Sequence, residues 1–419
     1  GENFDGHNFL GEAIKRGAAG VILSNPSYLS EDMTSEGNLP FVIQSQNTLR
    51  ALQDLASYQR TRFPFQIVAV TGTNGKSTTK EMIASIIETK YKTLKTQGNL
   101  NNHIGLPLTL LARKPEHEVG VLEMGMSAAG EIKRLAEIAR PDIGVITNIS
   151  AGHLEQLKTV KDVQAAKGEL FHSLDKEGTA IVNADDPLVI ELAKSLRTKK
   201  ITYGIEQSAD VQASNIQNKG SRGFTFTAKI FNQTIFVNLS QIGYCNIYNA
   251  LAALAAGHSL GISGNDMSRG LENYQKIPQR NEQIRYEGVT LINDAYNANP
   301  QSMRAAIKTL SEFDTQGKRF LVIGDMLELG PLSESAHHEL GQEITLSNLD
   351  HLVTVGPLAS LVAESAKKNS RHPLQIGKFK THTEAANYLL SNVNKGDCLL
   401  IKGSRGAKME NVIQEYLNT

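Results

Sequence analysis

Apolar runs and amphipathic segments alternate along most of the chain. Residues 65–70 (FQIVAV) are mostly apolar, as expected for a parallel strand covered on both faces. A glycine loop follows, and then a segment with one apolar face at Met82, Ile83, Ile86 and Ile87, which predicts a helix. Further strands are predicted at residues 119–123, 143–148 and 179–183, with helices between them. This alternation predicts a doubly wound, P-loop-type parallel sheet.

The pattern changes after residue 210 and is restored near Pro278. Residues 210–240 alternate polar and β-prone side chains, which predicts a small antiparallel addition to the parallel sheet. An alanine-rich segment at 243–260 predicts a helix. Beyond Pro278, strands predicted at 290–294, 319–325, 351–355 and 398–402 alternate with helices, so a Rossmann-like C-terminal domain is expected.

The first 62 residues predict a small α/β unit. Strands are expected at 20–24 and 40–43, and a helix at 47–62. Two strands are too few for a stable sheet, so we expect this domain to be shortened at its N-terminus. With 419 residues the chain is too long for one core, so an α/β protein of three domains is expected, at residues 1–63, 64–276 and 277–419.

Composition narrows the function classes. Lys plus Arg and Asp plus Glu number 43 each, which gives no support for broad nucleic-acid binding. Cys245 and Cys398 form neither a CxxC pair nor a zinc spacing, so a reducing, cytoplasmic setting is expected. No apolar run reaches the ~18 residues typical of a membrane span. The first residues, GENFDG, do not resemble a signal peptide.

A glycine loop between a predicted strand and a predicted helix is the main chemical signal. Residues 71–77 read Thr-Gly-Thr-Asn-Gly-Lys-Ser. Glycines let backbone amides face phosphate oxygens, and the helix N-terminus adds free N–H groups. Lys76 can reach the outer phosphates of ATP, and the Ser77 hydroxyl can bind magnesium. Val70 replaces the outer glycine of the full P-loop pattern, so a tight turn without a nucleotide is the alternative interpretation.

Several blocks extend the signal beyond this loop. TGTNGKSTTKEMI, TQGNLNNHIGLPLTLL, LEMGMSAAGEI, ITNISAGHLE, AAKGELF and GYCNIYNALAA resemble the Mur ligases, and so do DAYNANPQSM, VIGDMLELG and LIKGSRGAKME. The resemblance covers nearly the whole chain, although the family's first domain begins some tens of residues earlier. The DAYNANP and GDMLELG blocks favour the member that adds D-alanyl-D-alanine to UDP-N-acetylmuramoyl-tripeptide.

The resemblance implies an ATP-dependent amide ligase of cytoplasmic peptidoglycan precursor synthesis. A substrate carboxylate takes the γ-phosphoryl group of ATP, giving an acyl phosphate and ADP, and the incoming amine then displaces phosphate. Cations must offset the repulsion between the carboxylate and the triphosphate. ATP and two Mg²⁺ ions are the implied cofactors. The implied partners are the two substrates alone, and a monomer is expected.

Four residues are the expected magnesium ligands. Glu123 ends a predicted buried strand, where doubly wound folds place ligand groups, and a salt bridge or helix cap is the alternative. By itself His153 reads more readily as a loop histidine, and Lys167 as a solvated lysine. The resemblance makes His153 a ligand beside Ser77, and Lys167 a carbamylated lysine, a modification that requires a neutral amine.

The remaining candidates follow mainly from the resemblance. ATP contacts are implied for the whole loop (Thr71, Gly72, Thr73, Asn74, Gly75, Lys76 and Ser77), for Asn249 at the adenine, and for Arg280 and Asp294. Catalytic roles are implied for Lys76, Glu123, His153, Lys167 and Arg280. Substrate contacts are expected at His7, Asn99, Asn101, Asn102, Ser127, Tyr296, Asn297, Asn299, Lys402, Ser404 and Arg405. A solvated basic turn is the alternative for Lys402 and Arg405, and Asn246 is expected to cap the helix that carries Asn249.

Other interpretations stay open at this point. Adjacent helical positions diverge by about 100°, so His337 and His338 cannot easily share a metal and are interpreted as surface or helix-packing residues. A sister ligase that adds another amino acid, or folylpolyglutamate synthase, would share the loop and the general fold. A non-catalytic nucleotide-binding protein is the third possibility, and Lys76, Glu123, His153 and Lys167 together argue against it.

Overall fold

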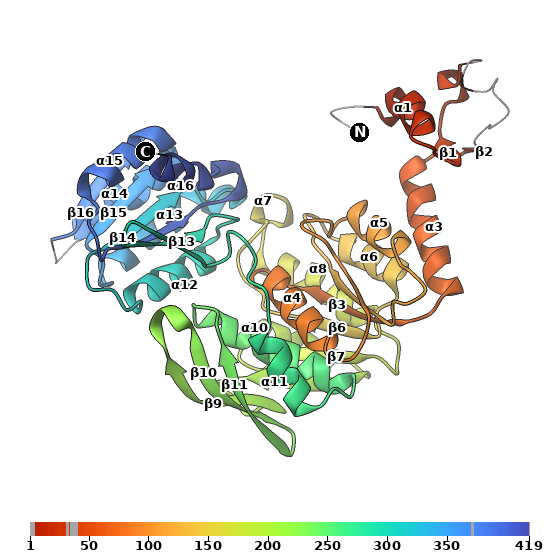
Figure 1. The fold of residues 1–419 in the computed structure, drawn as a ribbon, viewed down its shortest axis with the longest axis horizontal. Coiled ribbons are helices and arrows are strands. Elements are labelled where there is room, and N and C mark those ends of the chain that lie inside the picture. The colour runs from red at the N-terminus through yellow and green to blue at the C-terminus, as the bar shows by residue number, and fades with distance from the viewer. Residues whose placement is uncertain (1–4, 31–32, 34–40, 370–372, 419) are drawn as a thin grey trace.

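Three sheets follow one another along the chain, each with its own helices (Figure 1). The computed structural model describes residues 5–30, 33, 41–369 and 373–418. Within them the sheets have two, nine and six strands, and most neighbouring strands are parallel. The predicted three-domain α/β class is therefore confirmed.

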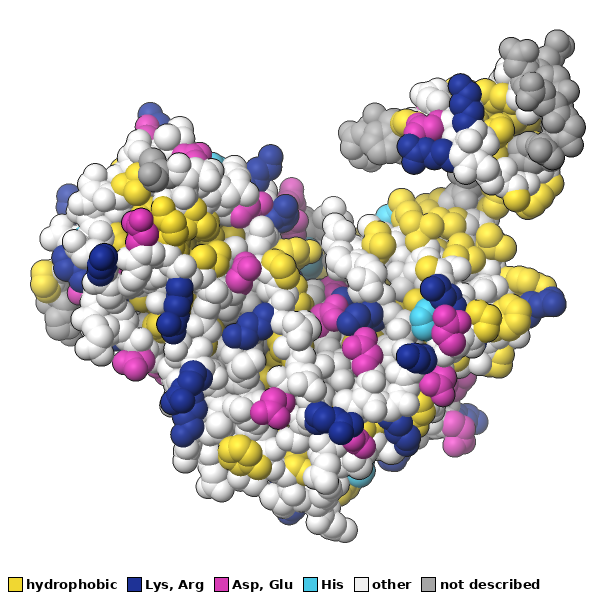
Figure 2. Space-filling view, viewed as in Figure 1, with side chains coloured by type: hydrophobic (Ala, Val, Ile, Leu, Met, Phe, Trp, Pro, Cys, Tyr) yellow, Lys and Arg dark blue, Asp and Glu magenta, His cyan; other side chains and the backbone are white. Residues whose placement is uncertain are grey.

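The N-terminal unit stands away from the rest of the molecule (Figures 1 and 2). Its two strands, β1 (Gly20–Leu23) and β2 (Phe41–Gln44), pair in parallel; Pro40, predicted to begin the second, lies outside the described residues. Helix α3 (Thr48–Arg62) joins the unit to the central domain. The Asn47 side chain caps α3 by accepting from Arg50 N at 2.8 Å. The other short helices are η1 (Gly6–Phe9), α1 (Leu10–Lys15) and η2 (Pro26–Tyr28).

The nine-stranded central sheet has the order β11-β10-β9-β8-β7-β6-β3-β5-β4. Its parallel part comprises β3 (Gln66–Thr71), β4 (Thr93–Lys95), β5 (Val119–Glu123), β6 (Ile143–Ile146), β7 (Thr179–Asn183) and β8 (Lys199–Gly204). The antiparallel addition comprises β9 (Val211–Asn218), β10 (Phe224–Ile230) and β11 (Gln233–Leu239), as predicted. On β10 buried and less buried positions alternate, which is the pattern of a strand with only one face against the core.

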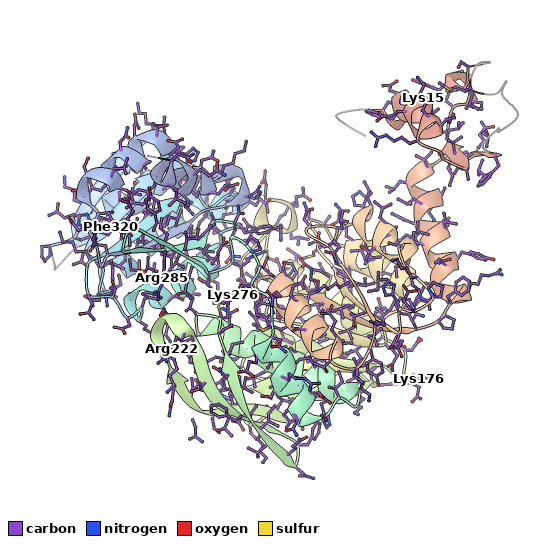
Figure 3. The ribbon with its side chains drawn as sticks, viewed as in Figure 1. Lys15, Lys176, Arg222, Lys276, Arg285 and Phe320 are labelled. Atoms are coloured by element: carbon purple, nitrogen blue, oxygen red, sulfur yellow. The ribbon has the colours of Figure 1, made fainter. Side chains whose placement is uncertain are left out.

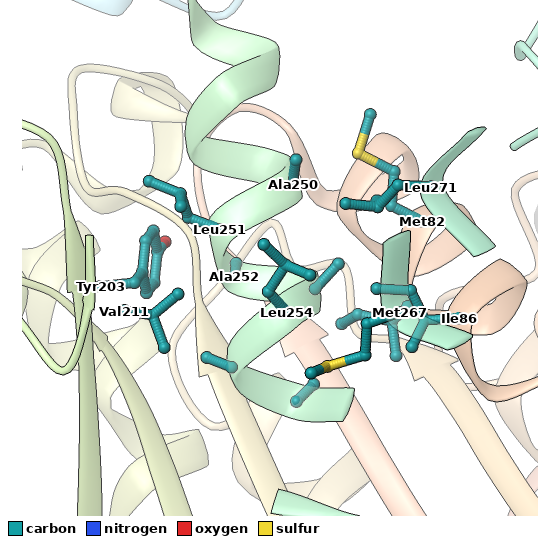
Figure 4. Packing of buried hydrophobic residues seen from close by; sticks show 14 of the residues in the cluster. Met82, Ile86, Tyr203, Val211, Ala250, Leu251, Ala252, Leu254, Met267 and Leu271 are labelled. Carbon is teal, nitrogen blue, oxygen red and sulfur yellow. The ribbon is translucent and has the colours of Figure 1, made fainter. Parts of the chain in front are cut away.

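Helices cover both faces of the parallel part, and each face forms its own apolar core. One core packs α4 (Lys76–Ile87), α10 (Cys245–Ser259) and α11 (Gly264–Glu272) on the sheet. Figure 4 shows Met82 and Ile86 of α4 close to Leu271 and Met267 of α11 in this core. The other core contains α3, α5 (Gly105–Leu111), α6 (Glu131–Ala139), α8 (Val160–His172) and α9 (Pro187–Lys194). Burial on both sides explains why these strands read as continuous apolar runs.

The C-terminal sheet has the order β12-β13-β17-β14-β15-β16. Its strands are β12 (Glu282–Tyr286), β13 (Val289–Asp294), β14 (Arg319–Gly324), β15 (His351–Val355), β16 (Gln375–Phe379) and β17 (Cys398–Lys402), and only β12 is antiparallel. Helices α12 (Pro300–Ser311), α13 (Ser333–Ile344) and α14 (Pro357–Asn369) lie on one face; α15 (His382–Asn392) and α16 (Glu410–Leu417) lie on the other. Lys276 marks the segment that leads from the central domain into this sheet (Figure 3).

Acidic and basic side chains are interspersed over the face shown in Figure 2. In the described part of the chain, none of the helices combines the length and the apolar character needed to cross a bilayer.

Candidate active site

The phosphate loop is held in a closely packed turn between β3 and α4. Gly75 caps α4 in the left-handed region, with φ of 81°, and a Cβ there would collide with the Asn249 side chain. Gly72 has φ of 149°, and a Cβ there would collide with Thr147. Both glycines are therefore required by conformation and by space. Asn74 N donates to Asn148 Oδ1 at 3.0 Å, which ties the loop to the end of β6.

Lys76 folds back over this loop. Its Nζ donates to Gly72 O at 2.9 Å and to Thr73 O at 3.2 Å. Desolvation by the surrounding protein lowers the pKa of Lys76, and Arg280 lowers it further, whereas Glu123 opposes the shift. The Lys76 amine therefore interacts electrostatically with Glu123 of the central domain and with Arg280 of the C-terminal domain.

A cavity of about 850 Å³ opens between the central and C-terminal domains. Most of the residues predicted for the site line it: Thr73, Asn74, Gly75, Lys76, Asn101, Asn102, Glu123, Ser127, His153, Lys167, Asn249, Arg280, Asp294, Tyr296, Asn297, Asn299 and Lys402. The loops after β3, β5, β6 and β13 supply many of these residues. Ligands of open α/β sheets bind at these carboxyl ends of the strands.

Seven predicted residues lie outside this lining: Thr71, Gly72, Ser77, His7, Asn99, Ser404 and Arg405. The Thr71 hydroxyl is buried and donates to Met124 O at 2.8 Å. Ser404 is also buried, where its hydroxyl accepts from Leu327 N at 2.8 Å. Arg405 pairs with Glu410 at 2.8 Å. These contacts hold each side chain in its own part of the fold.

His7 belongs to the N-terminal unit and is engaged there. Its Nε2 accepts from Ser24 N at 3.1 Å, its Nδ1 lies 2.6 Å from Asp5 Oδ1, and its ring stacks on Tyr28. Both ring nitrogens are thereby used to hold the local turn. The contacts present around His7 are structural.

Glu123 has one satisfied and one unsatisfied carboxylate oxygen. The side chain is buried, and Asn101 Nδ2 donates to its Oε1 at 2.7 Å. Oε2 has no hydrogen-bond partner among the described residues. Thr96 fixes the backbone at this strand end, since Glu123 N donates to Thr96 Oγ1 at 3.0 Å. A buried carboxylate oxygen without a partner is costly unless a cation or a donor completes it.

Lys167 is also buried, on the inward face of α8. Burial lowers the pKa of Lys167 well below its ordinary value, and the nearby positive charge of Lys76 adds to the shift. No carboxylate in the described part of the chain forms an ion pair with it. Desolvation and like charge together favour the neutral amine, which is the form that carbon dioxide can modify.

His153 stands at the start of the four-residue helix α7 (Leu154–Leu157), with a left-handed φ of 58°. Its Nδ1 lies 2.9 Å from Oε2 of Glu328, which belongs to the C-terminal domain. In the described residues no three His, Cys, Asp or Glu side chains gather closely enough to hold a metal by themselves. A cation in this cavity would therefore need ligands beyond these side chain types, such as the oxygen atoms of a bound triphosphate.

The C-terminal domain contributes a basic and aromatic wall. The Arg280 guanidinium lies 4.0 Å from the centre of the Tyr296 ring. Lys402 Nζ donates to Asp294 Oδ2 at 2.6 Å and to Asn297 O at 2.9 Å. Lys402 is buried, so the alternative interpretation as part of a solvated basic turn does not hold for it.

Two asparagines of α10 bond each other beneath the loop. Asn249 Oδ1 accepts from Thr79 Oγ1 at 3.1 Å, and its Nδ2 donates to Asn246 Oδ1 at 2.9 Å. The expectation that Asn246 caps α10 is wrong, because its Nδ2 donates to Ile242 O at 2.6 Å and no side chain caps this helix.

His337 and His338 separate as their spacing predicts. His337 is fully buried in helix packing, where its Nε2 accepts from Met326 N at 3.0 Å and its Nδ1 lies 2.6 Å from Ser333 O. His338 is exposed.

The cavity is also lined by side chains that were not assigned to the site from the sequence alone. Examples are Asn148, Asp185, Asp186, Cys245 and Tyr248. Asp185 and Asp186 come shortly after β7, so their position after a buried parallel strand was the available signal. Nothing in the local sequence places Tyr248 beside Asp185, to which its hydroxyl donates at 2.9 Å.

Comparison with known proteins decides the family. The model for the Mur ligase middle domain matches residues 70–257, and the model for the Mur ligase glutamate ligase domain matches residues 279–405. This chain belongs to the Mur ligase family. The matched segments hold the phosphate loop, Glu123, His153 and Lys167 in one Mur ligase domain, and Arg280, Asp294 and Lys402 in the other.

Similar Mur ligases match over the whole chain. A UDP-N-acetylmuramoyl-tripeptide–D-alanyl-D-alanine ligase of Bacillus subtilis is 39% identical, over 100% of this chain and 89% of the relative. The Escherichia coli protein of the same name is 35% identical, over 99% and 88%. A crystal structure of MurF from Acinetobacter baumannii has a TM-score of 0.89 and 32% identity, over 100% and 89%.

Two further solved structures, both with ADP, differ in how much sequence they share with this chain. MurF from Thermotoga maritima in complex with ADP has a TM-score of 0.85 and 28% identity, over 100% of this chain and 92% of that one. Mycobacterium tuberculosis folylpolyglutamate synthase with ADP has a TM-score of 0.70 but 16% identity, over 88% and 93%, so it shares the Mur ligase fold alone.

Proposed function

We propose that this Mur ligase uses ATP to join D-alanyl-D-alanine to UDP-N-acetylmuramoyl-tripeptide in the synthesis of peptidoglycan precursors. The carrying observation is the full-length similarity to ligases of that name. The cavity between the two matched domains agrees with it, because it gathers a phosphate loop, a buried acid and a basic wall.

The reaction requires two bond exchanges. An oxygen of the tripeptide carboxylate bonds to the γ-phosphorus of ATP while the bond from that phosphorus to the leaving ADP oxygen breaks. The amine nitrogen of D-alanyl-D-alanine then bonds to the acyl carbon, phosphate leaves, and the nitrogen loses a proton. Positive charge must surround the phosphoryl group in the first step.

The chain's own residues are assigned to that first step as follows. Lys76 and the amides of residues 71–77 bind the outer phosphates, and Arg280 approaches them from the C-terminal domain. Lys76 and Arg280 line the same cavity although they belong to different domains, which supports this assignment. Asn249, below the loop, and Asp294 are proposed to orient the nucleoside.

Magnesium fits the acidic side of the cavity. Glu123, with its unpartnered Oε2, and His153 are the proposed protein ligands, with Ser77 on the loop and a carbamate on Lys167 completing the set. When bound, magnesium would neutralise phosphate charge. Carbamylation of the neutral Lys167 amine by carbon dioxide, with loss of one proton, would give an anion that attracts the nearby Lys76 ammonium.

The substrates are assigned to the remaining surfaces. We propose residues 1–63 for the UDP end with His7, residues 64–276 for ATP, and residues 277–419 for the dipeptide. Asn99, Asn101, Asn102 and Ser127 are assigned to the muramoyl peptide. Tyr296, Asn297, Asn299, Lys402, Ser404 and Arg405 are assigned to the dipeptide side. A cytoplasmic monomer fits the soluble nucleotide substrates.

Phosphate release with purified protein tests this function. With UDP-N-acetylmuramoyl-tripeptide, ATP and Mg²⁺, we expect release to depend on D-alanyl-D-alanine and to be slight without an amine. Diaminopimelate, lysine and glutamate are the matched competitors. A preference for any of them would indicate a sister ligase, brisk ATP hydrolysis without substrate would contradict the acyl-phosphate route, and ATP binding without product would indicate a non-catalytic protein.

A further inference from the structure

His153 and Glu328 form a contact between two domains at the edge of the cavity. His153 follows β6 of the central sheet, and Glu328 follows β14 of the C-terminal sheet. The distance from His153 Nδ1 to Glu328 Oε2 is 2.9 Å. At this distance the imidazole N–H donates to the Glu328 carboxylate. A charged acceptor makes this a strong class of hydrogen bond.

Backbone contacts seat the same two segments on each other. Glu155 N donates to Glu328 O at 3.3 Å. Gly330 has φ of 53°, and a Cβ there would lie 3.3 Å from Glu155 Cα and 3.4 Å from Leu154 O. The 325–330 loop therefore rests on the first turn of α7, and the side-chain contact is part of a built interface.

Buried residues of the C-terminal domain fix the position of this loop. Met326 N donates to Nε2 of the fully buried His337 at 3.0 Å. Leu327 N donates to the buried Ser404 hydroxyl at 2.8 Å. Glu328 itself has a left-handed φ of 62°. The carboxylate is thus presented to His153 by a loop that is anchored at the two residues directly before it.

The imidazole lies between this carboxylate and the cavity. His153 lines the cavity, whereas Glu328 does not. With Nδ1–H donated to the carboxylate, Nε2 carries the lone pair and is the nitrogen left for a ligand in the cavity. Histidines that bind metals almost always donate their other N–H to a carboxylate, a carbonyl or water, which fixes tautomer and ring orientation.

We infer that Glu328 is a positioning residue that fixes the tautomer of His153 and thereby couples the seating of the C-terminal domain to cation binding in the central domain. This inference rests on the proposed role of His153 as a cation ligand. If the domain swings away, the loop leaves α7 and the imidazole loses its carboxylate. Cation affinity then falls without any change in the central domain's own residues.

Two measurements on the whole protein test this coupling. ¹⁵N NMR of the imidazole nitrogens in ligand-free protein reports the His153 tautomer, with His153→Ala identifying its signals. Mn²⁺ titration in the presence of ADP, followed by electron paramagnetic resonance, reports cation affinity. The variants are Glu328→Ala, Glu328→Gln, which keeps an uncharged acceptor, and Glu155→Gln, which removes a neighbouring charge that makes no bond to His153.

We expect Glu328→Ala to move the His153 proton toward Nε2 and to weaken Mn²⁺ binding on the order of tenfold. In both the His153 tautomer and the Mn²⁺ affinity, Glu328→Gln should lie between Glu328→Ala and the parent protein, and Glu155→Gln should match the parent. Unchanged thermal unfolding of the variants excludes loss of folding as the cause.

The outcomes separate this inference from the function it rests on. Suppose that His153→Ala weakens Mn²⁺ binding. An unchanged tautomer in Glu328→Ala, or a changed tautomer with unchanged Mn²⁺ affinity, then overturns the role of Glu328. Equal effects of Glu155→Gln and Glu328→Gln overturn it as well, because charge alone would then account for both. If His153→Ala binds Mn²⁺ as tightly as the parent, the ligand role of His153 fails first.

Discussion

Asn74 of the phosphate loop and Asn299 of the C-terminal domain bond each other through both ends of their amides. Asn299 Nδ2 donates to Asn74 Oδ1 at 2.7 Å, and Asn74 Nδ2 donates to Asn299 Oδ1 at 3.3 Å. Asn74 Nδ2 also donates to Gln301 Oε1 at 2.8 Å. The Asn74 side chain therefore joins the phosphate loop of the central domain directly to the C-terminal domain.

Asn74→Ala should loosen this contact while the Asn299 cap of α12 stays intact. Partly exposed hydrogen bonds contribute about 0.5–1.5 kcal/mol each, so the open population should rise several-fold. Small-angle X-ray scattering of the ligand-free protein should then show a larger radius of gyration. Arg304→Ala is the control, since Arg304 of the same helix pairs with Glu343 inside the C-terminal domain. An equal increase in both variants would contradict the prediction.

Replacing either of two buried lysines by methionine should change the stability of the protein, but in opposite directions. Lys167 has no ion-pair partner, so Lys167→Met should raise stability while abolishing ligase activity. Lys80 Nζ donates to Thr96 O at 2.6 Å and pairs with Glu81 at 2.7 Å, so Lys80→Met should cost about 1–3 kcal/mol. Calorimetry in buffer free of carbon dioxide measures both, and a lower melting temperature for Lys167→Met would contradict the assignment.

The stability gain of Lys167→Met should depend on pH. The pKa of Lys167 is lowered in the folded protein. Below the ordinary pKa of 10.5 the unfolded chain therefore binds more protons at this lysine than the folded protein does. The parent protein is therefore stabilised as pH rises through that window. The advantage of the variant should shrink toward pH 10.5, and melting curves across the alkaline range would show whether it does.

Lys167→Ala should lose most ligase activity, and short-chain carboxylates should restore part of it. The added anion would occupy the space and supply the charge of the proposed carbamate. Phosphate release with and without acetate or propionate measures the rescue. An alanine variant with unaltered activity would rule out a catalytic role for this lysine.

Tyr296 should position Arg280 through its ring alone. The guanidinium lies 4.0 Å from the ring centre, a contact worth about 0.5–2 kcal/mol. Tyr296→Leu should raise the KM for ATP about fivefold, which corresponds to about 1 kcal/mol. Tyr296→Phe keeps the ring and should resemble the parent. Equal effects of both variants would assign the role to the hydroxyl instead.

Cys245 should report nucleotide occupancy. The thiol is exposed to the cavity, and desolvation by the surrounding protein raises its pKa to about 11. Alkylation by iodoacetamide should therefore be slow at neutral pH, accelerate about tenfold per pH unit below that value, and be blocked by ATP. Cys398 is buried and serves as the internal control, with modification mapped by mass spectrometry.

The elements closest to the chemistry could be predicted from sequence because their signals are local. A strand buried on both faces reads as an apolar run, so β5, β7, β15 and β17 were predicted with their observed bounds. Gly72 and Gly75 mark the phosphate loop because no side chain fits there. Strands β12 and β16 were missed because edge strands carry more polar and exposed positions, and β8 was missed because it begins with two exposed lysines.

Periodicity and motifs depend on neighbours along the chain, and they sufficed to predict the fold class, the family and the order of the domains. The tertiary structure sets which strand ends meet. It brought Lys167 beside Lys76, placed Asp185 and Cys245 in the cavity, and left Ser77 and Arg405 out of it. It also set Glu328 against His153, a contact between residues 175 positions apart. Such contacts depend on how two separately folded sheets pack against each other, and no local pattern encodes that distance.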